Sequence, residues 1–377
     1  MSEPLKVLIV FGTRPEAIKM APLCMELAKR ETIKPSICVT AQHREMLDQV
    51  LKLFNIYPDY DLNIMQQNQD LWSLTAGVLV KMKEIIETAS PHIILVHGDT
   101  TTTMATALSA FYFKIPVGHV EAGLRTFDKY YPFPEEINRV VTDYVSSFYF
   151  APTEKAVQNI IHSGIKSEQV FKTGNTVIDA LLYTVNNHKT DLKPLGLNNN
   201  LKTILLTSHR RENFGKPLEN ICQAIIEIVK SNPGVQVVYP VHLNPNVKEP
   251  VCRMLGGKER IILTDPMEYA PFATLMSESY IILTDSGGIQ EEAPSLGIPV
   301  LVLRDETERP EAIKNGTVLL AGTNKENIVS LTNKLINDRV FYKSMAEATN
   351  PYGDGKAASR IADILTGYQD QLILKSL

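Results

Sequence analysis

Short apolar runs rich in β-branched residues alternate with amphipathic stretches along most of this sequence, and this alternation is what most restricts its fold. Strands that are buried on both faces read as continuous apolar runs, and helices between such strands produce parallel sheets. Amphipathic stretches such as 17–29, 44–54 and 217–230 predict helices of this kind. Four runs predict one sheet and five predict a second: residues 5–11, 36–40, 93–97 and 116–120, then 203–207, 235–239, 261–263, 281–284 and 300–303. The expected fold class is therefore α/β, with two Rossmann-like domains, each built on a doubly wound parallel sheet.

The two predicted sheets belong to two domains, since a chain of 377 residues is too long for one ordinary core. Between Asn186 and Asn200 the sequence holds five asparagines and loses its apolar periodicity, so we expect the domain change within about 15 residues of this stretch. The halves also echo each other, because in each a strand, an acidic residue, a small polar loop and a helix precede Ile-Pro-Val, at 115–117 and at 298–300. Ligands of such folds bind at the carboxyl ends of the strands, so the crevice between the two domains is the expected site.

Composition and charge exclude several classes of protein. The 38 Lys and Arg residues against 42 Asp and Glu residues give a net charge of −4, without the basic excess of a nucleic-acid binder. No run approaches the roughly 18 apolar residues of a membrane-spanning helix, and the apolar run at 7–11 is too short for a signal peptide. His97 and His119 lie inside predicted strands and are expected to be satisfied core histidines, and no clustered ligands predict a metal site. The cysteines have neither paired nor metal-like spacing, and we expect all four to be buried thiols of a cytoplasmic protein: Cys24, Cys38, Cys222 and Cys252.

Polar residues gather where the predicted strands end. After the first strand, the segment at 12–16 presents a helix N-terminus and Arg14, which together suit an anion, and it lacks the Gly-x-Gly-x-x-Gly pattern of a dinucleotide site. After the first strand of the second half, the segment at 207–213 offers His209 and two arginines. The plainer alternatives are a strand–helix turn with a solvated arginine and a structural arginine–glutamate pair.

A second anion site is predicted in the second half. Ser286, Gly287 and Gly288 close a strand and open a helix whose exposed backbone N–H groups suit a diphosphate. Glu292 follows about one turn later, where a carboxylate can accept both hydroxyls of a ribose. A Gly-Gly turn that only tightens packing is the alternative.

A set of carboxylates comes from the first half of the chain. Asp99 follows one predicted strand, Glu121 follows the next, and Glu135 and Glu136 lie in the segment at 132–139. Crowded carboxylates raise one another's pKa, which general acid–base catalysis at neutral pH requires. A single carboxylate of this kind can instead be a helix N-cap, and Asp99 before a row of threonines fits that interpretation as well.

Taken together, these motifs resemble the bacterial non-hydrolysing UDP-N-acetylglucosamine 2-epimerases. The resemblance runs from about residue 5 to 365, and many motifs occur in order along the chain. They are the segments at 11–19, 40–44, 97–99, 121–126, 132–139, 173–175, 209–213 and 285–292.

The resemblance implies a GT-B architecture, in which two Rossmann-like domains face each other across a cleft that holds the active site. The segment at 359–371 would be a C-terminal helix that crosses back to the first domain. The implied domains are therefore 1–172 plus 359–377, and 173–358, the second of which binds UDP. The family interconverts UDP-N-acetylglucosamine (UDP-GlcNAc) and UDP-N-acetylmannosamine (UDP-ManNAc), needs no cofactor, is typically homodimeric, and usually supplies surface polysaccharides.

The resemblance also implies roles for particular residues. The catalytic residues would be Asp99, Glu121, Glu135 and His209, and the residues that bind substrate and UDP would be Arg14, Lys19, Ser286, Gly287, Gly288 and Glu292. A second UDP-GlcNAc, acting as an allosteric activator, would contact Gln42, His43, Glu136, Arg210 and His242. Two features bear on that second site: Asn68 stands where some members carry an arginine to the effector, and Gln42 and His43 could simply cap the next helix.

Direct removal of the proton from C2 of the sugar is chemically unfavourable. The proton on C2 of the sugar has no adjacent carbonyl, and no nicotinamide motif is present to oxidise the sugar first. The remaining route eliminates UDP through a glycal-like alkene and adds it back after reprotonation on the opposite face. A hydrolysing relative that releases N-acetylmannosamine and a GT-B glycosyltransferase are the alternatives.

Overall fold

The computed structural model describes residues 3–41, 44–64 and 70–375. The chain forms two compact units. Unit 1 comprises Met1–Ala180 and Tyr352–Leu377, and unit 2 comprises Leu181–Pro351. Across the described ranges, no helix combines the length and the apolar character needed to cross a lipid bilayer.

Unit 1 contains a seven-stranded sheet in the order β3-β2-β1-β4-β5-β6-β7, and all of its strand pairs are parallel. The chain moves from β1 outwards to β3 and then returns to the other side of β1, so the winding reverses between β1 and β4. The strands are β1 (Leu5–Phe11), β2 (Ile33–Val39), β3 (Tyr60–Asp61), β4 (Ile93–His97), β5 (Val117–Val120), β6 (Phe148–Ala151) and β7 (Val170–Lys172).

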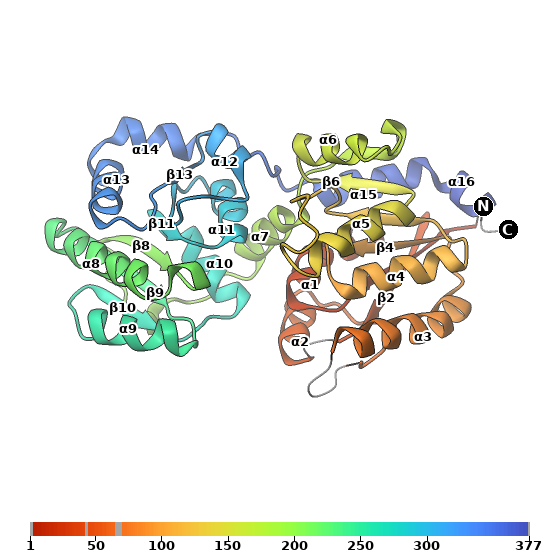
Figure 1. Cartoon of the computed structure of the whole chain (residues 1–377), viewed down its shortest axis with the longest axis horizontal. Helices are drawn as coiled ribbons and strands as arrows, with labels where there is room; N and C mark the ends of the chain where they lie inside the picture. Colours follow the sequence, from red (N-terminus) through yellow and green to blue (C-terminus); the bar gives the residue numbers. More distant parts are fainter. Residues whose placement is uncertain (1–2, 42–43, 65–69, 376–377) are drawn as a thin grey trace. The chain divides into compact units, whose positions relative to one another are not determined.

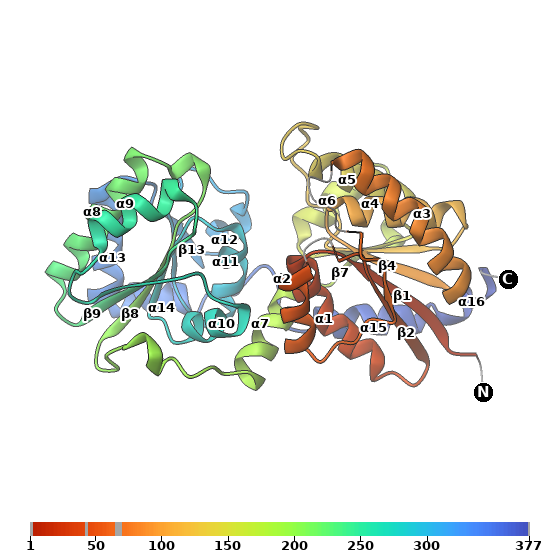
Figure 2. The ribbon, with the colours of Figure 1, turned by 90° about the horizontal axis from the view of Figure 1, so that it is seen from below.

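Helices cover both faces of the unit 1 sheet. In Figure 2, α3, α4 and α5 lie on one face and α1 and α15 lie on the other. Leu8, Val10, Ile94 and Val96 turn from the central strands towards α3 and α4, where they join a buried cluster with Met82. The helices are α1 (Arg14–Ala28), α2 (Arg44–Leu53), α3 (Leu71–Ala89), α4 (Thr101–Tyr112), α5 (Glu135–Val145), α6 (Glu154–His162), α15 (Ala357–Gly367) and α16 (Gln369–Lys375), with a 3₁₀ turn η1 (Ser167–Gln169). Helix α7 (Thr176–Asn187) begins in unit 1, and its residues from Leu181 on belong to unit 2.

Unit 2 repeats this winding with six parallel strands in the order β10-β9-β8-β11-β12-β13. Its reversal lies between β8 and β11, which therefore correspond to β1 and β4 of unit 1. The strands are β8 (Lys202–Thr207), β9 (Val235–Pro240), β10 (Ile261–Thr264), β11 (Ile281–Thr284), β12 (Val300–Val302) and β13 (Val318–Leu320).

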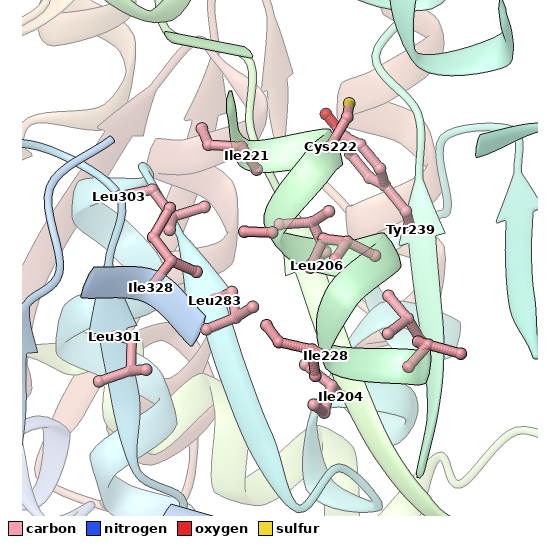
Figure 3. Packing of buried hydrophobic residues seen from close by; sticks show 14 of the residues in the cluster. Ile204, Leu206, Ile221, Cys222, Ile228, Tyr239, Leu283, Leu301, Leu303 and Ile328 are labelled. Carbon is pink, nitrogen blue, oxygen red and sulfur yellow. The ribbon is translucent and has the colours of Figure 1, made fainter. Parts of the chain in front are cut away.

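The core of unit 2 lies between its sheet and helices α8, α9 and α13. Figure 3 shows Ile221 and Ile228 of α8 and Ile328 of α13 packed over Leu206 and Leu283 of the central strands. Figure 1 labels the helices of this unit along the chain. They are α8 (Lys216–Ser231), α9 (Pro245–Leu255), α10 (Tyr269–Ser277), α11 (Gly287–Glu292), α12 (Pro310–Lys314), α13 (Lys325–Asn337) and α14 (Arg339–Ala346), with 3₁₀ turns η2 (Lys193–Leu195), η3 (Arg211–Asn213) and η4 (Ala293–Leu296).

The fold class predicted from the sequence, two doubly wound parallel-sheet domains, is confirmed. The prediction did not include β3, β6, β7 and β13, which have only two to four residues each. Strand β12 has only three residues and was predicted, so strand length alone does not explain these omissions.

One prediction about the cysteines is wrong. Cys24, Cys38 and Cys222 are buried, but Cys252 is exposed. It lies on α9, whose buried side chains Val247, Val251 and Leu255 recur every four residues and face the core. Cys252 directly follows Val251, so it projects about 100° away from that apolar stripe.

The end of the chain packs on unit 1. Asp179 of α7 accepts the backbone N–H groups of Ala357 and Ala358 at 3.2 and 2.9 Å, and so holds the first turn of α15. Further along, Arg30 of unit 1 forms an ion pair with Asp363 at 2.8 Å. These contacts fasten the segment that follows unit 2 to a unit whose sheet was completed almost two hundred residues earlier.

Candidate active site

In unit 1, three residues with predicted roles follow the ends of β1 and β4, where the strand winding reverses, and of the adjacent strand β5. The turn after β1 leads to Arg14, the turn after β4 carries Asp99, and Glu121 directly follows β5. At such a reversal the connections leave two adjacent strands in opposite directions, so their carboxyl ends stay open to a ligand.

Glu16, for which the sequence predicted no role, organises the turn after β1. Its carboxylate accepts the backbone N–H groups of Gly12 and Thr13 at 3.1 and 2.8 Å, while the Thr13 hydroxyl caps α1. The other carboxylate oxygen accepts the hydroxyls of Thr100 and Thr103 at 2.7 and 3.2 Å. Burial raises the pKa of Glu16 above its usual range, although these hydrogen bonds oppose the shift. The Thr-x-x-Glu spacing is a capping-box signature, so the sequence did contain the signal.

Arg14 and Lys19 both belong to α1 but have different surroundings. Arg14 is half-buried in the first turn, and no carboxylate of the described ranges lies within ion-pair distance of it. Lys19 lies about one turn later, where its ammonium group forms an ion pair with Glu121 at 2.5 Å. Arg14 therefore offers a guanidinium group next to a helix N-terminus, an arrangement that favours an anion.

Glu121 is held tightly in an unusual backbone conformation. Its φ of 65° lies in the left-handed region, which costs a non-glycine residue on the order of 1–3 kcal/mol and is commonest at functional sites. Its Oε2 atom contacts Lys19 Nζ and also accepts a hydrogen bond from Asn175 Nδ2 at 2.9 Å. Asn175 belongs to the segment at 173–175, so that motif supports the carboxylate.

Asp99 forms an ion pair with Arg139 of α5. The guanidinium Nε and Nη2 atoms lie 3.0 and 2.5 Å from Asp99 Oδ2, and Asn138 donates to the Asp99 backbone carbonyl at 2.9 Å. The alternative role as a helix cap is wrong, because the Thr100 hydroxyl caps α4. The Asp99 side chain is 29% exposed, so this carboxylate keeps access to solvent or substrate.

Glu135 and Glu136 begin α5 and differ in their surroundings. Glu135 Oε2 is buried without a hydrogen-bond partner in the part of the chain that the structure describes. Glu136 instead accepts bonds from Arg125 Nε and the Phe127 N–H on one oxygen, and from the Thr126 N–H and Arg139 Nη1 on the other. Burial raises the pKa of Glu136, but these donors outweigh burial and hold the pKa below its usual range.

The prediction that both core histidines are satisfied is half wrong. His119 is buried, and both of its ring nitrogens have a partner: Asp143 and the Gly98 carbonyl, each at 2.7 Å. His97 is equally buried, but neither of its ring nitrogens has a hydrogen-bond partner among the described residues, and its Nε2 lies 3.8 Å from Glu121 Oε2. Burial lowers the pKa of His97 to about 3, so its imidazole is neutral at physiological pH.

In unit 2, Asp285 at the end of β11 holds the segment that follows β8. Its Oδ2 atom accepts the hydroxyl of Ser208, the backbone N–H groups of His209 and Arg210, and the side-chain amide of Asn213, all within 3.0 Å. Asp285 is completely buried. One carboxylate thus joins the two strand ends at the reversal, a role for which the sequence offered no signal beyond its place in a motif.

His209 projects from this anchored segment and is 39% exposed. Its ring is nearly parallel to that of His242, with the two ring centres 5.7 Å apart, and its Nδ1 lies 3.4 Å from Asp285 Oδ1. Burial lowers the pKa of His209 below its usual value; the Asp285 carboxylate opposes the shift, and His242 and Arg210 reinforce it. His209 is therefore mostly neutral at pH 7 and is able to accept a proton.

The Ser286–Gly288 turn opens α11 beside two guanidinium groups. A Cβ atom placed on Gly287 would lie 3.7 Å from Arg210 Nη2 and 3.8 Å from Arg309 Nη2. Arg309 forms an ion pair with Glu291, whereas no carboxylate in the described part of unit 2 is paired with Arg210. The turn therefore combines helix N–H groups, unhindered backbone and positive charge, which is an anion-binding arrangement.

Other predicted residues have fewer contacts or lie outside the described ranges. Glu292 ends α11 near the Tyr269 hydroxyl, at 3.5 Å. Gln42, His43 and Asn68 are outside the described residues. Among the residues that are described, no group of three or more histidines, cysteines and carboxylates has the geometry of a metal site.

The sequence and the structure both match known proteins over nearly their whole length. The family model for UDP-N-acetylglucosamine 2-epimerase matches residues 25–366. The UDP-N-acetylglucosamine 2-epimerase of Salmonella typhimurium is 55% identical over 377 residues, which cover 98% of this chain and 100% of that protein. The UDP-GlcNAc 2-epimerase of Neisseria meningitidis, solved bound to UDP-GlcNAc, is 52% identical with a TM-score of 0.86, covering 96% of this chain and 100% of that chain. The UDP-GlcNAc 2-epimerase of Methanocaldococcus jannaschii also has a TM-score of 0.86, at 35% identity, with the same coverage.

Proposed function

Because the chain belongs to the UDP-N-acetylglucosamine 2-epimerase family, we propose that it interconverts UDP-GlcNAc and UDP-ManNAc by eliminating UDP and adding it back, without net hydrolysis. The observation that carries this proposal is the environment of Glu121. A carboxylate at a strand end, in a left-handed backbone conformation and contacted by Lys19 and Asn175, is suited to moving a proton.

The proposed reaction breaks the bond between C1 and the diphosphate oxygen, and the bonding electrons leave with UDP. A base takes the proton from C2, and a double bond forms between C1 and C2. A second group then delivers a proton to the opposite face of C2 while the diphosphate oxygen bonds to C1 again. All atoms are recovered, so the reaction consumes no oxidant and no water.

The two faces of C2 require two acid–base groups, and unit 1 supplies candidates. We assign this work to the set Asp99, Glu121 and Glu135. Arg139 and Lys19 provide positive charge beside the first two. Glu135 Oε2 is buried and has no hydrogen-bond partner among the described residues. A substrate hydroxyl that donates to this oxygen would remove the free-energy cost of leaving it unsatisfied.

The departing diphosphate requires positive charge and N–H donors, and each unit, taken by itself, contains groups of this kind. In unit 1, Arg14 lies in the first turn of α1. In unit 2, Arg210 and Arg309 flank the turn at Gly287. We assign to His209, which lies beside Asp285, the sharing of a proton with the leaving oxygen. Stabilising charge that develops in the transition state is commonly the largest catalytic contribution.

We also propose that a second UDP-GlcNAc binds as an activator at Arg210 and His242; Gln42 and His43, which the resemblance also implies for this role, lie outside the described residues. Arg210 supports this, since no carboxylate within the described ranges neutralises it. Glu136, which the resemblance also implies for this role, already accepts hydrogen bonds from the 125–127 segment and Arg139 on both of its oxygens.

A homodimer is the proposed assembly. Helices α3, α4 and α5 pack side by side and leave large apolar side chains exposed: Trp72, Phe111, Tyr112 and Tyr144. Exposed apolar side chains on neighbouring elements are typical of a protein interface. Sedimentation at micromolar concentration should give twice the mass of one chain, and the mass of a single chain would contradict the assembly.

Incubation of the purified protein with UDP-GlcNAc in heavy water tests the reaction. We expect UDP-ManNAc with deuterium at C2, and we expect the remaining UDP-GlcNAc to gain deuterium as well. Free N-acetylmannosamine would show the hydrolysing reaction instead. Dependence on an added acceptor would show a glycosyltransferase.

Two conservative substitutions test the acid–base assignment. Asp99→Asn and Glu121→Gln each remove an ionisable group at nearly constant size, and turnover should fall by about 10²-fold or more. Isothermal calorimetry should show that both variants still bind UDP. Glu249→Gln, which changes an exposed carboxylate on α9, is the matched control and should leave turnover unchanged. Near-normal turnover in both test variants would remove these residues from the mechanism.

A further inference from the structure

We propose that His119 is a positioning residue for this reaction: as an imidazolium bonded between Asp143 and the Gly98 carbonyl, it fixes the peptide that carries Asp99. The sequence pointed only to a core histidine. The inference rests on the proposed function in one respect, namely that Asp99 acts on the substrate.

The protonation of His119 follows from its two partners. Its Nε2 lies 2.7 Å from the Gly98 carbonyl oxygen, which only accepts, so Nε2 carries a hydrogen. Its Nδ1 lies 2.7 Å from Asp143 Oδ1, and this second contact also needs a hydrogen between its two atoms. A neutral imidazole carries one N–H, which can serve only one of these two hydrogen bonds. The His119–Asp143 pair must therefore hold a second proton, on Nδ1 or on the carboxyl group.

The charge around Asp143 indicates where that second proton lies. Arg125 Nη1 is 3.8 Å from Asp143 Oδ2, which favours the ionised carboxylate and therefore an imidazolium. The side chains of His119 and Asp143 are only 1% and 2% exposed, and an unbalanced charge would be costly at that depth. An imidazolium–carboxylate pair carries no net charge and satisfies both contacts. The Tyr149 hydroxyl, from the neighbouring strand β6, donates to the Asp143 backbone carbonyl at 2.7 Å.

The consequence for Asp99 comes through Gly98. The Gly98 N–H donates to the Val120 carbonyl at 2.9 Å, and the Gly98 carbonyl accepts from His119. Two consecutive residues of β5 thus hold both polar groups of Gly98, whose φ of 68° is in the left-handed region. The Asp99 carbonyl is held in turn by Asn138. The backbone on both sides of the Asp99 side chain is therefore fixed.

The same imidazole links the two proposed acid–base residues. Glu121 follows Val120 directly, and its Oε1 would lie 3.7 Å from a Cβ atom placed on Gly98. The ends of β4 and β5 are thus fastened to each other beside both carboxylates. Without the bond from His119, the Gly98 carbonyl would lose its partner and the peptide could rotate, and misplacement of a catalytic group by about 1 Å can cost 10²-fold in rate.

Nitrogen NMR of the protein labelled at histidine tests the protonation without reference to activity. We expect one histidine with both ring nitrogens protonated at pH 8, and we expect this signal to vanish in His119→Phe. In Asp143→Asn the amide N–H can donate to Nδ1, so the same ring should become neutral with its hydrogen on Nε2. If no histidine is doubly protonated at pH 8, the assignment is overturned.

Kinetics of the same variants test the positioning role. His119→Phe should lower kcat by about 10- to 100-fold with little change in KM, because the substrate-binding residues are untouched. Asp143→Asn keeps the bond to Gly98 and should retain kcat within about threefold. If His119→Phe fails to fold, Asp143→Asn still decides, since a loss of about 10²-fold in a folded Asp143→Asn protein contradicts a role carried by the Gly98 bond.

The two proposals fail in distinguishable ways. If the wild-type protein places no deuterium at C2, the proposed reaction fails, and the NMR result still stands for His119. If the wild-type protein exchanges C2 while His119→Phe turns over normally, the reaction stands and the positioning role fails.

Discussion

At the scale of single residues, the backbone of Gly12, just after β1, lies close to the side chains of two buried threonines. A Cβ atom on Gly12 would lie 2.0 Å from Thr40 Oγ1 and 2.8 Å from Thr102 Oγ1, two hydroxyls that are hydrogen-bonded to each other at 3.0 Å. Both threonines are fully buried, so neither side chain has free space to move into. The turn that leads to Arg14 therefore requires glycine for close approach rather than for a positive φ.

We predict that Gly12→Ala lowers the free energy of unfolding by about 1–3 kcal/mol, because the added methyl group overpacks a buried site. Urea unfolding followed by circular dichroism measures the change. Combining Gly12→Ala with Thr40→Ala removes the nearest atom, so the cost of the glycine substitution should be smaller in that background. Gly77→Ala on α3 is the matched control: its Cβ would meet nothing within 4 Å, and it should stabilise by up to about 1 kcal/mol. An equal effect at both glycines would contradict this account.

At the scale of elements, the link between α7 and α15 depends on a buried carboxylate. Asp179 accepts two backbone N–H groups at the start of α15. Burial raises the pKa of Asp179 to about 6, above its ordinary value of 3.8, although the two N–H groups oppose the shift. Between pH 3.8 and about pH 6 the folded state therefore binds more protons than the unfolded state. The stability that this group contributes is therefore present below about pH 4 and is lost as the pH rises through 6.

We predict that the wild-type protein gains stability relative to Asp179→Asn when the pH falls from 7 to 4.5. The difference should change by on the order of 2 kcal/mol, since one pKa unit corresponds to about 1.4 kcal/mol. Urea unfolding of both proteins at the two pH values measures it. Asp354→Asn is the control: Arg360 lowers the pKa of Asp354 below 3.8, so its contribution to stability is lost only below about pH 4 and should stay nearly constant between pH 7 and 4.5. A pH-independent difference between wild type and Asp179→Asn would show that the carboxyl does not titrate in this range.

At the scale of the whole molecule, the two units differ in how the chain builds them. Unit 2 is one continuous segment with its own buried core, whereas unit 1 needs the residues after Pro351 as well as those before Leu181. Tyr352, Ile361 and Leu365 of the late segment are fully or almost fully buried. Tyr368 packs edge-on against Phe148 and Phe171 of the unit 1 sheet.

We predict that ending the chain after Pro351 destabilises unit 1 more than unit 2, because the removed segment belongs to unit 1 and carries buried apolar side chains of that unit. Hydrogen exchange followed by mass spectrometry separates the two: amides of β4 and β5 should lose protection, and those of β8 and β11 should keep it. Removal of α16 alone is the milder control and should have a smaller effect on the same strands. Equal loss of protection in the strands of both units would contradict this prediction.

Much of the fold could be predicted because its signals are local. A strand buried on both faces requires an apolar run such as 93–97, and a helix start such as Thr13-x-x-Glu16 leaves a recognisable spacing. The two-residue strand β3 has no such signal, because two residues cannot establish a period. The exposure of Cys252 was missed for a related reason, since one position around a helix decides whether a side chain faces the core.

The sequence by itself determined the two parallel sheets, the family and the residue types at the strand ends, because these depend on neighbours along the chain. Only the tertiary structure decided which groups meet. Lys19 pairs with Glu121 across 102 positions, Asp285 holds a segment more than 70 residues earlier, and His119 joins Asp143 to Gly98. The protonation and orientation of each group depend on its partner, and partners that are distant in sequence are chosen by packing that no local pattern encodes.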